Sequence, residues 1–371
     1  MQEDVIRYGF IGAGMMGREH LRNVGLTPGS RITAIVEPDA GSRSEAAAFA
    51  PQDVKVFEDL SGLLDSRCVD ALVIAAPNDT HSAIMAEIFE SGLDVPLLLE
   101  KPVCTDAAQV RWLAEAASTY RSPIWVGMEY RYMPPVAEFV QRVRASDCGE
   151  PKMIAMREHR FPFLKKVGNW NRYSKRTGGT LVEKCCHFFD LMRLLAADDA
   201  VRVFASAGID VNHRDEVRED GERPDVIDNA FVVVDFKSGM RACLDLCMFA
   251  EGARWQEEFS VTGSRGRLEC FIPGHRYEDA DRAEIEYSPR AEGAAIERLP
   301  VDVPPEILKA GGHHGSTYYQ HQKFRKAVLG EGPVEVTLQD GLKAVVIGLA
   351  AELSARQKRS VSIDGLDIRV D

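Results

Sequence analysis

A glycine-rich turn near the N-terminus constrains the fold of this chain more than any other feature. Residues 5–11, VIRYGFI, have the apolar character of a strand, and Gly12, Gly14 and Gly17 follow them in the spacing GxGxxG. A helical pattern then runs to about Gly25. A strand, a tight glycine turn and a helix in this order are typical of the first unit of a parallel, doubly wound sheet.

Strand and helix patterns alternate through the first third of the chain. Further segments with strand character cover 31–37, 70–77, 95–102 and 123–129. The segment 70–77 is almost wholly apolar, as expected for a strand that is buried on both faces. Strands that alternate with helices form parallel sheets, so we predict a doubly wound α/β Rossmann domain over residues 1–127.

An acidic residue at the end of the second strand indicates that the glycine turn binds a dinucleotide. Glu37 lies about twenty positions after Gly17, where a carboxylate can accept hydrogen bonds from the adenosine ribose of a dinucleotide. The amide groups that begin the first helix would hold the phosphates. The residues expected to bind NAD here are Gly12, Ala13, Gly14, Met15 and Met16. A carboxylate repels a 2′-phosphate, so NADP is less favoured, although Arg43 is near enough in sequence to soften that preference. The alternative is a tight turn that binds nothing.

The alternation of strands and helices stops after about residue 150. Strand patterns then follow one another directly, at 151–161, 201–209, 226–236, 240–249, 257–263 and 266–272. Such a series favours a large, mostly antiparallel, open sheet. We therefore predict an α+β domain over residues 128–371, with a polar excursion at 275–312 and two helices near the C-terminus.

Composition excludes some partners. The chain has 371 residues, enough for two domains, and a net charge of −12, which argues against nucleic acid and anionic membranes as partners. Its start lacks the pattern of a secretory leader, and no apolar run is long enough to span a bilayer. The eight cysteines form no CxxC pair and are expected to be reduced thiols in a cytoplasmic protein.

Polar residues follow two of the predicted parallel strands. Pro77, Asn78 and His81 come after one strand, and Glu100 and Lys101 come at the end of the next. A bound dinucleotide places its nicotinamide beyond the carboxyl ends of such strands, so we expect these five residues to line the cofactor site. The ammonium of Lys101 would then hold a substrate oxygen. The alternative is a surface lysine in a turn.

The segment TLVEKCCHFFDLM offers a proton-transfer pair. Glu183 and His187 are four residues apart and would share one face of a helix. A neutral imidazole suits the removal of a hydroxyl proton near pH 7, and Glu183 could fix its tautomer. A solvated helix face or a buried structural histidine would give the same pattern. No third ligand at a suitable spacing supports a metal site, nothing marks Cys185 or Cys186 as an activated nucleophile, and Lys184 has no evident role.

Four segments of the chain resemble the glucose–fructose oxidoreductase and inositol dehydrogenase (Gfo/Idh/MocA) family. They are GFIGAGMMGREH, APNDTH, EKP and GGTLVEKCCHFFDLMRLL, and the likeness extends over nearly the whole length. The resemblance implies a Rossmann domain followed by an α/β domain on an open antiparallel sheet, which usually mediates homodimers or homotetramers. It also implies reversible oxidation of a hydroxyl group on a sugar, a cyclitol or a related polyol.

The resemblance also implies roles for single residues. Lys101 matches the catalytic lysine of the family and His187 its catalytic histidine. Glu183 stands where the family usually has aspartate, which keeps the charge but lengthens the side chain. Tyr130 and Arg131 match a segment that reaches the active site in relatives and are expected to contact the substrate.

Basic residues are concentrated between Lys152 and Lys184. Nine lysines and arginines lie in this range against two glutamates, which would suit an anionic substrate such as a sugar acid or a sulfonated or phosphorylated sugar. A solvated loop face is an equally good interpretation. The other expected substrate contacts are Arg157, Trp170, His314 and Tyr318. His313 and His314 are adjacent and point different ways, so at most one of them should reach the pocket.

Three functions are compatible with these features. The first is an NAD-dependent dehydrogenase or reductase acting on a secondary hydroxyl of a sugar, cyclitol or sugar acid, with Lys101, Glu183 and His187 as catalytic residues. The second is an NAD-assisted glycosidase or lyase, in which transient oxidation permits bond cleavage. The third is an NAD-binding sensor that has lost activity.

Overall fold

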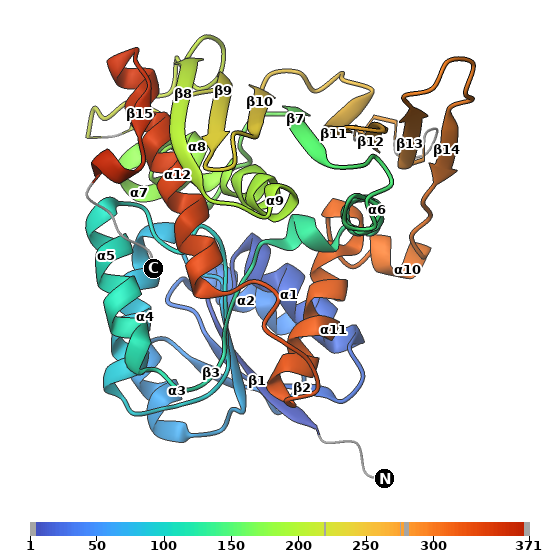
Figure 1. The fold of residues 1–371 in the computed structure, drawn as a ribbon. Helices are drawn as coiled ribbons and strands as arrows, with labels where there is room; N and C mark the ends of the chain where they lie inside the picture. The colour runs from blue at the N-terminus through green and yellow to red at the C-terminus, as the bar shows by residue number, and fades with distance from the viewer. Residues whose placement is uncertain (1–4, 219, 275, 278–281, 367–371) are drawn as a thin grey trace.

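The computed structural model describes residues 5–218, 220–274, 276–277 and 282–366. Two sheets are packed with helices between them, the smaller at the bottom and the larger at the top of Figure 1. The smaller sheet has six parallel strands in the order β3-β2-β1-β4-β5-β6. These strands are β1 (Ile6–Ile11), β2 (Ser30–Val36), β3 (Lys55–Phe57), β4 (Ala71–Ile74), β5 (Leu97–Leu99) and β6 (Ile124–Val126).

This order confirms the predicted doubly wound sheet and defines where a ligand can bind. The strand order reverses between β1 and β4, and ligands bind in the crevice beyond the carboxyl ends of such a pair. The strand β3 was not predicted because it is three residues long and mostly exposed, so it carries no apolar run. The helices of this unit are α1 (Met15–Leu26), α2 (Ala40–Ala46), α3 (Leu60–Ser66), α4 (His81–Glu90) and α5 (Ala107–Ala116).

The glycine turn between β1 and α1 shows why side chains are excluded from it. Gly12 has a φ of +94°, and a Cβ atom there would lie 2.6 Å from the Ala75 carbonyl oxygen of the neighbouring strand end. A Cβ atom on Gly17 would lie 2.2 Å from the Gly12 carbonyl oxygen, so helix and turn pack directly on each other. Around Gly14 there is open space instead, on the side where the phosphates of a dinucleotide are expected.

The larger sheet has nine strands in the order β14-β13-β12-β11-β7-β10-β9-β8-β15. All neighbours are antiparallel except β7 and β10, so the predicted mostly antiparallel sheet is confirmed. Its predicted strands are β7 (Pro151–His159), β8 (Ala200–Gly208), β9 (Asn229–Phe236), β10 (Arg241–Cys247), β11 (Trp255–Gly263) and β12 (Gly266–Pro273). Three others were missed, namely β13 (Glu284–Pro289), β14 (Glu297–Pro300) and β15 (Val361–Ser362).

The polar excursion predicted at 275–312 is more regular than its composition suggests. Its described part contains β13, β14 and the short helix α10 (Pro305–Leu308), while residues 275 and 278–281 lie outside the described residues. The strand β14 is exposed along its whole length at the sheet edge, so it has no buried face to impose an apolar alternation.

Helices cover one face of the large sheet. They include α6 (Pro134–Arg144), α9 (Cys186–Ala196) and α12 (Leu338–Gln357), which pack on β12, β7 and β8 respectively (Figure 1). The chain then returns to the first sheet, because α11 (Ser316–Val328) packs on α1 and α12 also contacts α5. The predicted boundary between residues 127 and 128 falls just after β6. Within the described residues, no helix has the length and apolar character needed to cross a membrane.

Candidate active site

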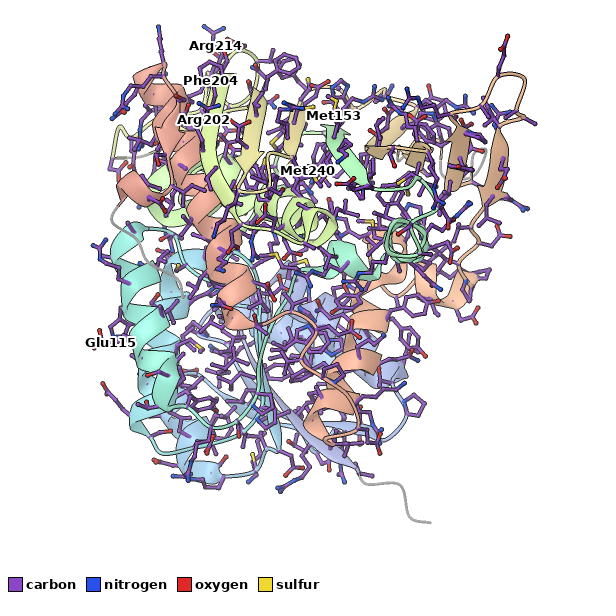
Figure 2. All side chains as sticks on the ribbon, in the orientation of Figure 1. Glu115, Met153, Arg202, Phe204, Arg214 and Met240 are labelled. Atoms are coloured by element: carbon purple, nitrogen blue, oxygen red, sulfur yellow. The ribbon has the colours of Figure 1, made fainter. Side chains whose placement is uncertain are left out.

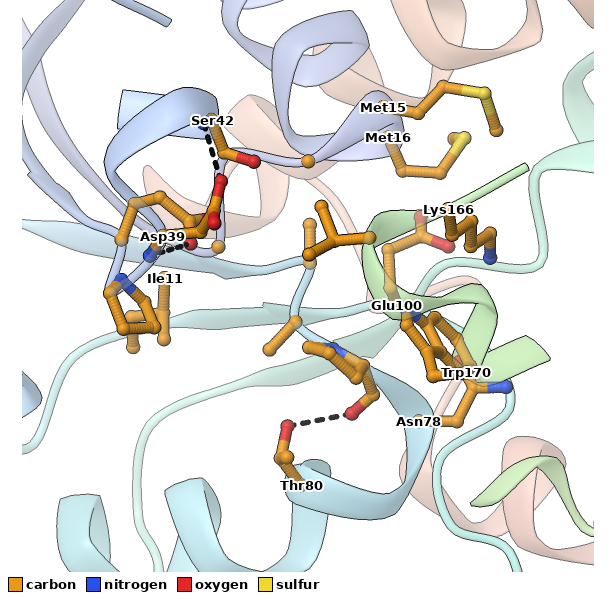
Figure 3. A pocket seen from close by; sticks show the side chains of 18 of the residues that line it. Ile11, Met15, Met16, Asp39, Ser42, Asn78, Thr80, Glu100, Lys166 and Trp170 are labelled. Carbon is orange, nitrogen blue, oxygen red and sulfur yellow. Dashed lines mark hydrogen bonds between the residues drawn. The ribbon is translucent and has the colours of Figure 1, made fainter. Parts of the chain in front are cut away.

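A pocket of about 840 Å³ opens beyond the carboxyl ends of β1 and β4. Figure 3 shows Asp39 and Ser42 at one end and Lys166 and Trp170 at the other. Most of the predicted cofactor residues line this pocket, namely Gly12, Gly14, Met15, Met16, Glu37, Pro77, Asn78, Glu100 and Lys101. One sheet edge thus gathers residues that are spread over almost ninety positions of the chain.

Two predicted cofactor residues, Ala13 and His81, are not on the pocket wall. Ala13 is fully buried, and its N–H donates to the Glu37 carboxylate over 2.7 Å. His81 is also fully buried, with its ring nitrogens 2.9 Å from the Pro102 carbonyl oxygen and 3.0 Å from that of Ala76. These contacts connect the turns after β4 and β5, so His81 stabilises the fold and does not contact the pocket.

The residues around the turn fit a dinucleotide. Gly14 caps α1 without a side-chain hydrogen bond, so the first amide groups of the helix are left for an anion. The Glu37 carboxylate is held by the N–H groups of Ala13 and Asp39, at 2.7 and 2.9 Å. Arg43 does not line the pocket, because its guanidinium donates to backbone carbonyls and to Glu58.

The helix predicted to carry both Glu183 and His187 is interrupted between them. The segment α8 (Thr180–Glu183) ends before α9 begins at Cys186. The Cys185 N–H reaches back five residues to the Thr180 carbonyl oxygen, which widens the turn. The freed Glu183 carbonyl oxygen accepts the Lys101 ammonium at 3.2 Å and the Cys186 thiol at 3.5 Å.

Because of this break, the predicted hydrogen bond between Glu183 and His187 is not formed. Glu183 lines the pocket, with one carboxylate oxygen 3.4 Å from the Lys166 ammonium and the other without a partner among the described residues. His187 does not line the pocket. Its ring stacks on Tyr130 with centroids 4.2 Å apart and an interplanar angle of 7°, so Tyr130 fixes the plane of the imidazole.

Charge distinguishes His187 from Lys101, two of the three predicted catalytic residues. Burial lowers the pKa of His187 well below its ordinary value, and the positive charges of Lys101 and Lys184 lower it further, so the ring is neutral at pH 7. Burial opposes the charge of Lys101 as well, but Cys186 and Glu183 act against it and the pKa of Lys101 is raised. The neutral imidazole of His187 therefore lies near the charged ammonium of Lys101.

A buried polar cluster lies on the far side of Tyr130 and explains Lys184. The Lys184 ammonium lies 2.5 Å from the Tyr130 hydroxyl and 2.9 Å from the Glu158 carboxylate. Arg160 lies 3.2 Å from the same carboxylate, and Glu257 accepts a bond from the Tyr130 hydroxyl at 3.3 Å. A lysine that is 4 % exposed is tolerated here because it is paired and hydrogen-bonded.

The structure brings His313, and not the predicted His314, next to Tyr130. The short helix η6 (His313–Gly315) places the His313 ring 5.2 Å from the Tyr130 ring and its Nδ1 atom 3.0 Å from the buried Glu129 carboxylate. Glu129 raises the pKa of His313 above its ordinary value, although burial lowers it. This pair joins residues 184 positions apart, and the repeated histidine in GGHHG was its only sequence signal.

Of the other predicted substrate residues, Trp170 lines the pocket, whereas Arg131, Arg157, His314 and Tyr318 do not. Arg131 makes two bonds to the buried Asp190, at 2.6 and 2.5 Å, and thereby ties the turn after β6 to α9. Arg157 pairs with Glu258 across β7 and β11. Tyr318 accepts a bond from the glutamine one turn later in α11. In the described part of the chain, no group of three or more His, Cys, Asp or Glu is arranged to hold a metal ion.

Two family profiles together match most of the chain. Residues 6–128 match the profile "Oxidoreductase family, NAD-binding Rossmann fold", and residues 140–363 match "Oxidoreductase family, C-terminal alpha/beta domain", the two halves of Gfo/Idh/MocA proteins. The chain belongs to the Gfo/Idh/MocA oxidoreductase family. The predicted family and the NAD-binding character of the first domain are thereby confirmed.

Individual members of the Gfo/Idh/MocA family show how far the likeness extends. Inositol 2-dehydrogenase of Rhizobium meliloti is 24% identical over 359 residues, which cover 96% of this chain and 99% of that protein. Inositol 2-dehydrogenase 2 of Paenarthrobacter aurescens is 35% identical over 155 residues, 40% of this chain and 45% of that protein.

Two solved structures share the fold. Levoglucosan dehydrogenase in complex with NADH and levoglucosan superposes with a TM-score of 0.81 at 19% identity, over 96% of this chain and 99% of that one. An oxidoreductase from Agrobacterium radiobacter in complex with NAD+, L-tartaric acid and magnesium has a TM-score of 0.78 at 16% identity, over 97% and 99%. At these identities the likeness shows the fold alone.

A partly buried glutamate holds the start of the helix that carries Glu183 and makes stability depend on pH. Glu352 of α12 accepts the Leu181 N–H at 3.0 Å, and burial raises its pKa from 4.5 to about 7. Between these values the folded state binds more protons than the unfolded state, so the free energy of unfolding falls as the pH rises through this range.

We expect Glu352→Gln, which keeps an acceptor for Leu181, to be more stable than the wild type by about 1–3 kcal/mol above pH 7. The difference should nearly vanish at about pH 4, below the unfolded-state pKa of 4.5, where this glutamate is protonated in both states. Urea unfolding at both pH values measures it, with the exposed Glu115→Gln on α5 as control (Figure 2). Equal stability of the Glu352→Gln variant and the wild type at both pH values would contradict the assignment.

Proposed function

We propose that this protein is an NAD-dependent dehydrogenase that transfers hydride between the nicotinamide and a secondary hydroxyl of a sugar, cyclitol or sugar acid. The observation that carries the proposal is the charged Lys101 at the end of the dinucleotide pocket, with the Glu183 carboxylate on the same wall. The activities named for the inositol 2-dehydrogenase and levoglucosan dehydrogenase relatives support it.

Each group has a distinct task in the proposed oxidation. Lys101 donates a hydrogen bond to the substrate hydroxyl oxygen and stabilises negative charge as it develops there. The neutral His187 accepts the hydroxyl proton. Bound NAD supplies the hydride acceptor, so the carbinol loses one hydride and one proton and becomes a carbonyl. The proposal requires the substrate to reach past Lys101 to His187. Glu183 then binds a second hydroxyl through its unpaired oxygen instead of orienting His187.

Lys101→Ala and His187→Ala should each lower kcat by about 10²- to 10⁴-fold. The first variant loses the group that stabilises negative charge on the substrate oxygen, and the second loses the group that accepts the hydroxyl proton. Cofactor affinity should stay within about threefold of the wild type, a difference well under 1 kcal/mol. Turnover is followed by absorbance of the reduced nicotinamide on a panel of polyols and sugar acids, and binding by NADH fluorescence. The exposed Lys152→Ala is the control. Normal turnover in both variants would remove these residues from the mechanism.

The same panel separates the other two functions. Cleavage of a glycoside without net change in the cofactor would support an NAD-assisted glycosidase or lyase. NADH binding without any reaction on the whole panel would support a sensor.

We propose that NAD is preferred over NADP because Glu37 occupies the place of the 2′-phosphate. Glu37→Gln keeps an acceptor for the Ala13 N–H but removes the charge. We expect its affinity for NADP to rise by about tenfold, with little gain for NAD. Titration of both reduced cofactors measures the ratio, and the exposed Glu115→Gln on α5, which does not line the pocket, is the control. An unchanged ratio of the affinities for NAD and NADP would show that residues other than Glu37 determine the cofactor preference.

We also propose a homodimer or homotetramer formed through the outer face of the large sheet. Apolar side chains stand exposed on it, among them Met153, Phe204, Phe231 and Val233, with Phe231 67 % exposed (Figure 2 labels Met153 and Phe204). Such a patch marks an interaction surface. Light scattering should give a particle mass of two or four chains. The double variant Phe204→Asp/Phe231→Asp should have a lower particle mass than the wild type. The variant Leu26→Asp on α1 should keep the wild-type particle mass. A wild-type mass of one chain would contradict this.

The thiols favour the cytoplasm as the place of action. All eight cysteines are free, and five of them are buried. Reduced thiols persist in compartments with a glutathione or thioredoxin system. Fractionation of the source cells tests this location, and recovery of the protein outside the cytoplasm would refute it.

A further inference from the structure

The end of the pocket that holds Trp170 carries an excess of positive charge. The cations that line it are Lys101, Lys165, Lys166 and Arg176, and the acids are Glu100 and Glu183. Arg176 is paired outside the pocket wall with Asp79, and Glu100 is bound by His20. Among the described residues, neither Lys101 nor Lys165 has a carboxylate oxygen within ion-pair distance, although Glu183 and Glu100 act on Lys101 from farther away.

The loop that carries Lys165 and Lys166 is shaped to present them. The helix η5 (Val167–Arg172) is interrupted by left-handed conformations at Gly168 and Asn169, with φ of 61° and 47°. This fold brings the ring of Trp170 back under Lys166, whose ammonium lies 4.3 Å from the ring centroid. The ammonium of Lys166 thereby makes a cation–π contact with Trp170 at this end of the pocket, where Figure 3 labels both residues.

A solvated loop does not account for these contacts. The Lys166 side chain is only 23% exposed, and burial lowers its pKa from the ordinary value despite the nearby Glu183 carboxylate. Its single ion pair, 3.4 Å to Glu183, is long for a charge-assisted bond. Lys166 is a partly buried ammonium with one distant carboxylate, and the exposed Lys165 beside it forms no ion pair among the described residues. A negatively charged ligand can therefore add a partner to both lysines.

We infer that Lys165 and Lys166 bind an anionic substituent of the substrate, so that the enzyme acts on sugars that carry a carboxylate, sulfonate or phosphate group. The substituent lies at the Trp170 end while Lys101 holds the reacting hydroxyl. This inference rests on the proposed dehydrogenase function and names the substrate class of the same site.

The test compares neutral and anionic compounds that have a six-membered ring of similar size. Glucose and myo-inositol are set against glucuronate, 6-deoxy-6-sulfoglucose and glucose 6-phosphate, whose separate results distinguish the three anionic groups. For each, kcat/KM is measured with NAD, and binding to the enzyme–NADH complex is measured by calorimetry. At least one anionic sugar should exceed both neutral compounds by about tenfold or more in kcat/KM or in affinity.

Three variants locate the effect. Lys166→Met keeps an unbranched side chain beside Trp170 but removes the charge, and should lower kcat/KM for the preferred anionic sugar by about 10- to 100-fold, the size of one lost charge-assisted hydrogen bond. Glucose should change by less than about threefold. Lys166→Arg should retain most of the preference, and the exposed Lys152→Met should behave as the wild type.

Each other result overturns the inference in a recognisable way. If neutral compounds react or bind at least as well as every anionic one, the inference is wrong and the dehydrogenase function stands. If Lys166→Met weakens NADH binding as much as sugar binding, the lysine serves the cofactor phosphates. If nothing in the panel reacts or binds while NADH does, both the inference and the proposed function fail.

Discussion

The widened turn at the end of α8, closed by the Cys185 N–H and the Thr180 carbonyl oxygen, is the constraint on which the candidate site depends. In a continuous helix the Glu183 carbonyl oxygen would accept an N–H four residues later and would not be available to a side chain. Here it accepts the Lys101 ammonium from the other domain. One irregular turn therefore fixes the lysine at the end of the pocket and separates the carboxylate of Glu183 from the imidazole of His187. Such widened turns recur at functional sites.

The orientation of His187 depends on charges that are buried behind it. Its ring has no hydrogen-bonded partner at Nδ1 among the described residues, so the flat face of Tyr130 does the positioning. Tyr130 is itself held at its hydroxyl by Lys184 and Glu257. Removing one member of a buried charged pair leaves its partner uncompensated, typically at a cost of about 3–5 kcal/mol. The cluster therefore restricts the imidazole more strictly than a single exposed carboxylate would.

The sequence predicted those parts of the site that follow from a repeating pattern. The glycine turn, Glu37 and Lys101 all sit at the ends of parallel strands, and strand periodicity places such ends together. The pairing of Glu183 with His187 assumed a regular helix, and a local change of helical bonding cannot be recognised from residue spacing. The contact of His313 with Glu129 depends on how the C-terminal chain returns to α1. No local sequence pattern encodes that path. The same path determines that His313, and not His314, lies next to Tyr130.

The two ends of the pocket carry opposite charge, and this polarity links cofactor and substrate choice. Acidic side chains line the end near α2, namely Glu37, Asp39, Glu45, Glu58 and Asp59, whereas lysines line the end near Trp170. The acidic end repels an anion and offers acceptors to the ribose hydroxyls, whereas at the other end the cations outnumber the two carboxylates, Glu100 and Glu183. A 2′-phosphate would meet the acidic end. The proposed preference for NAD over NADP and the proposed choice of an anionic sugar therefore rest on the same separation of charge.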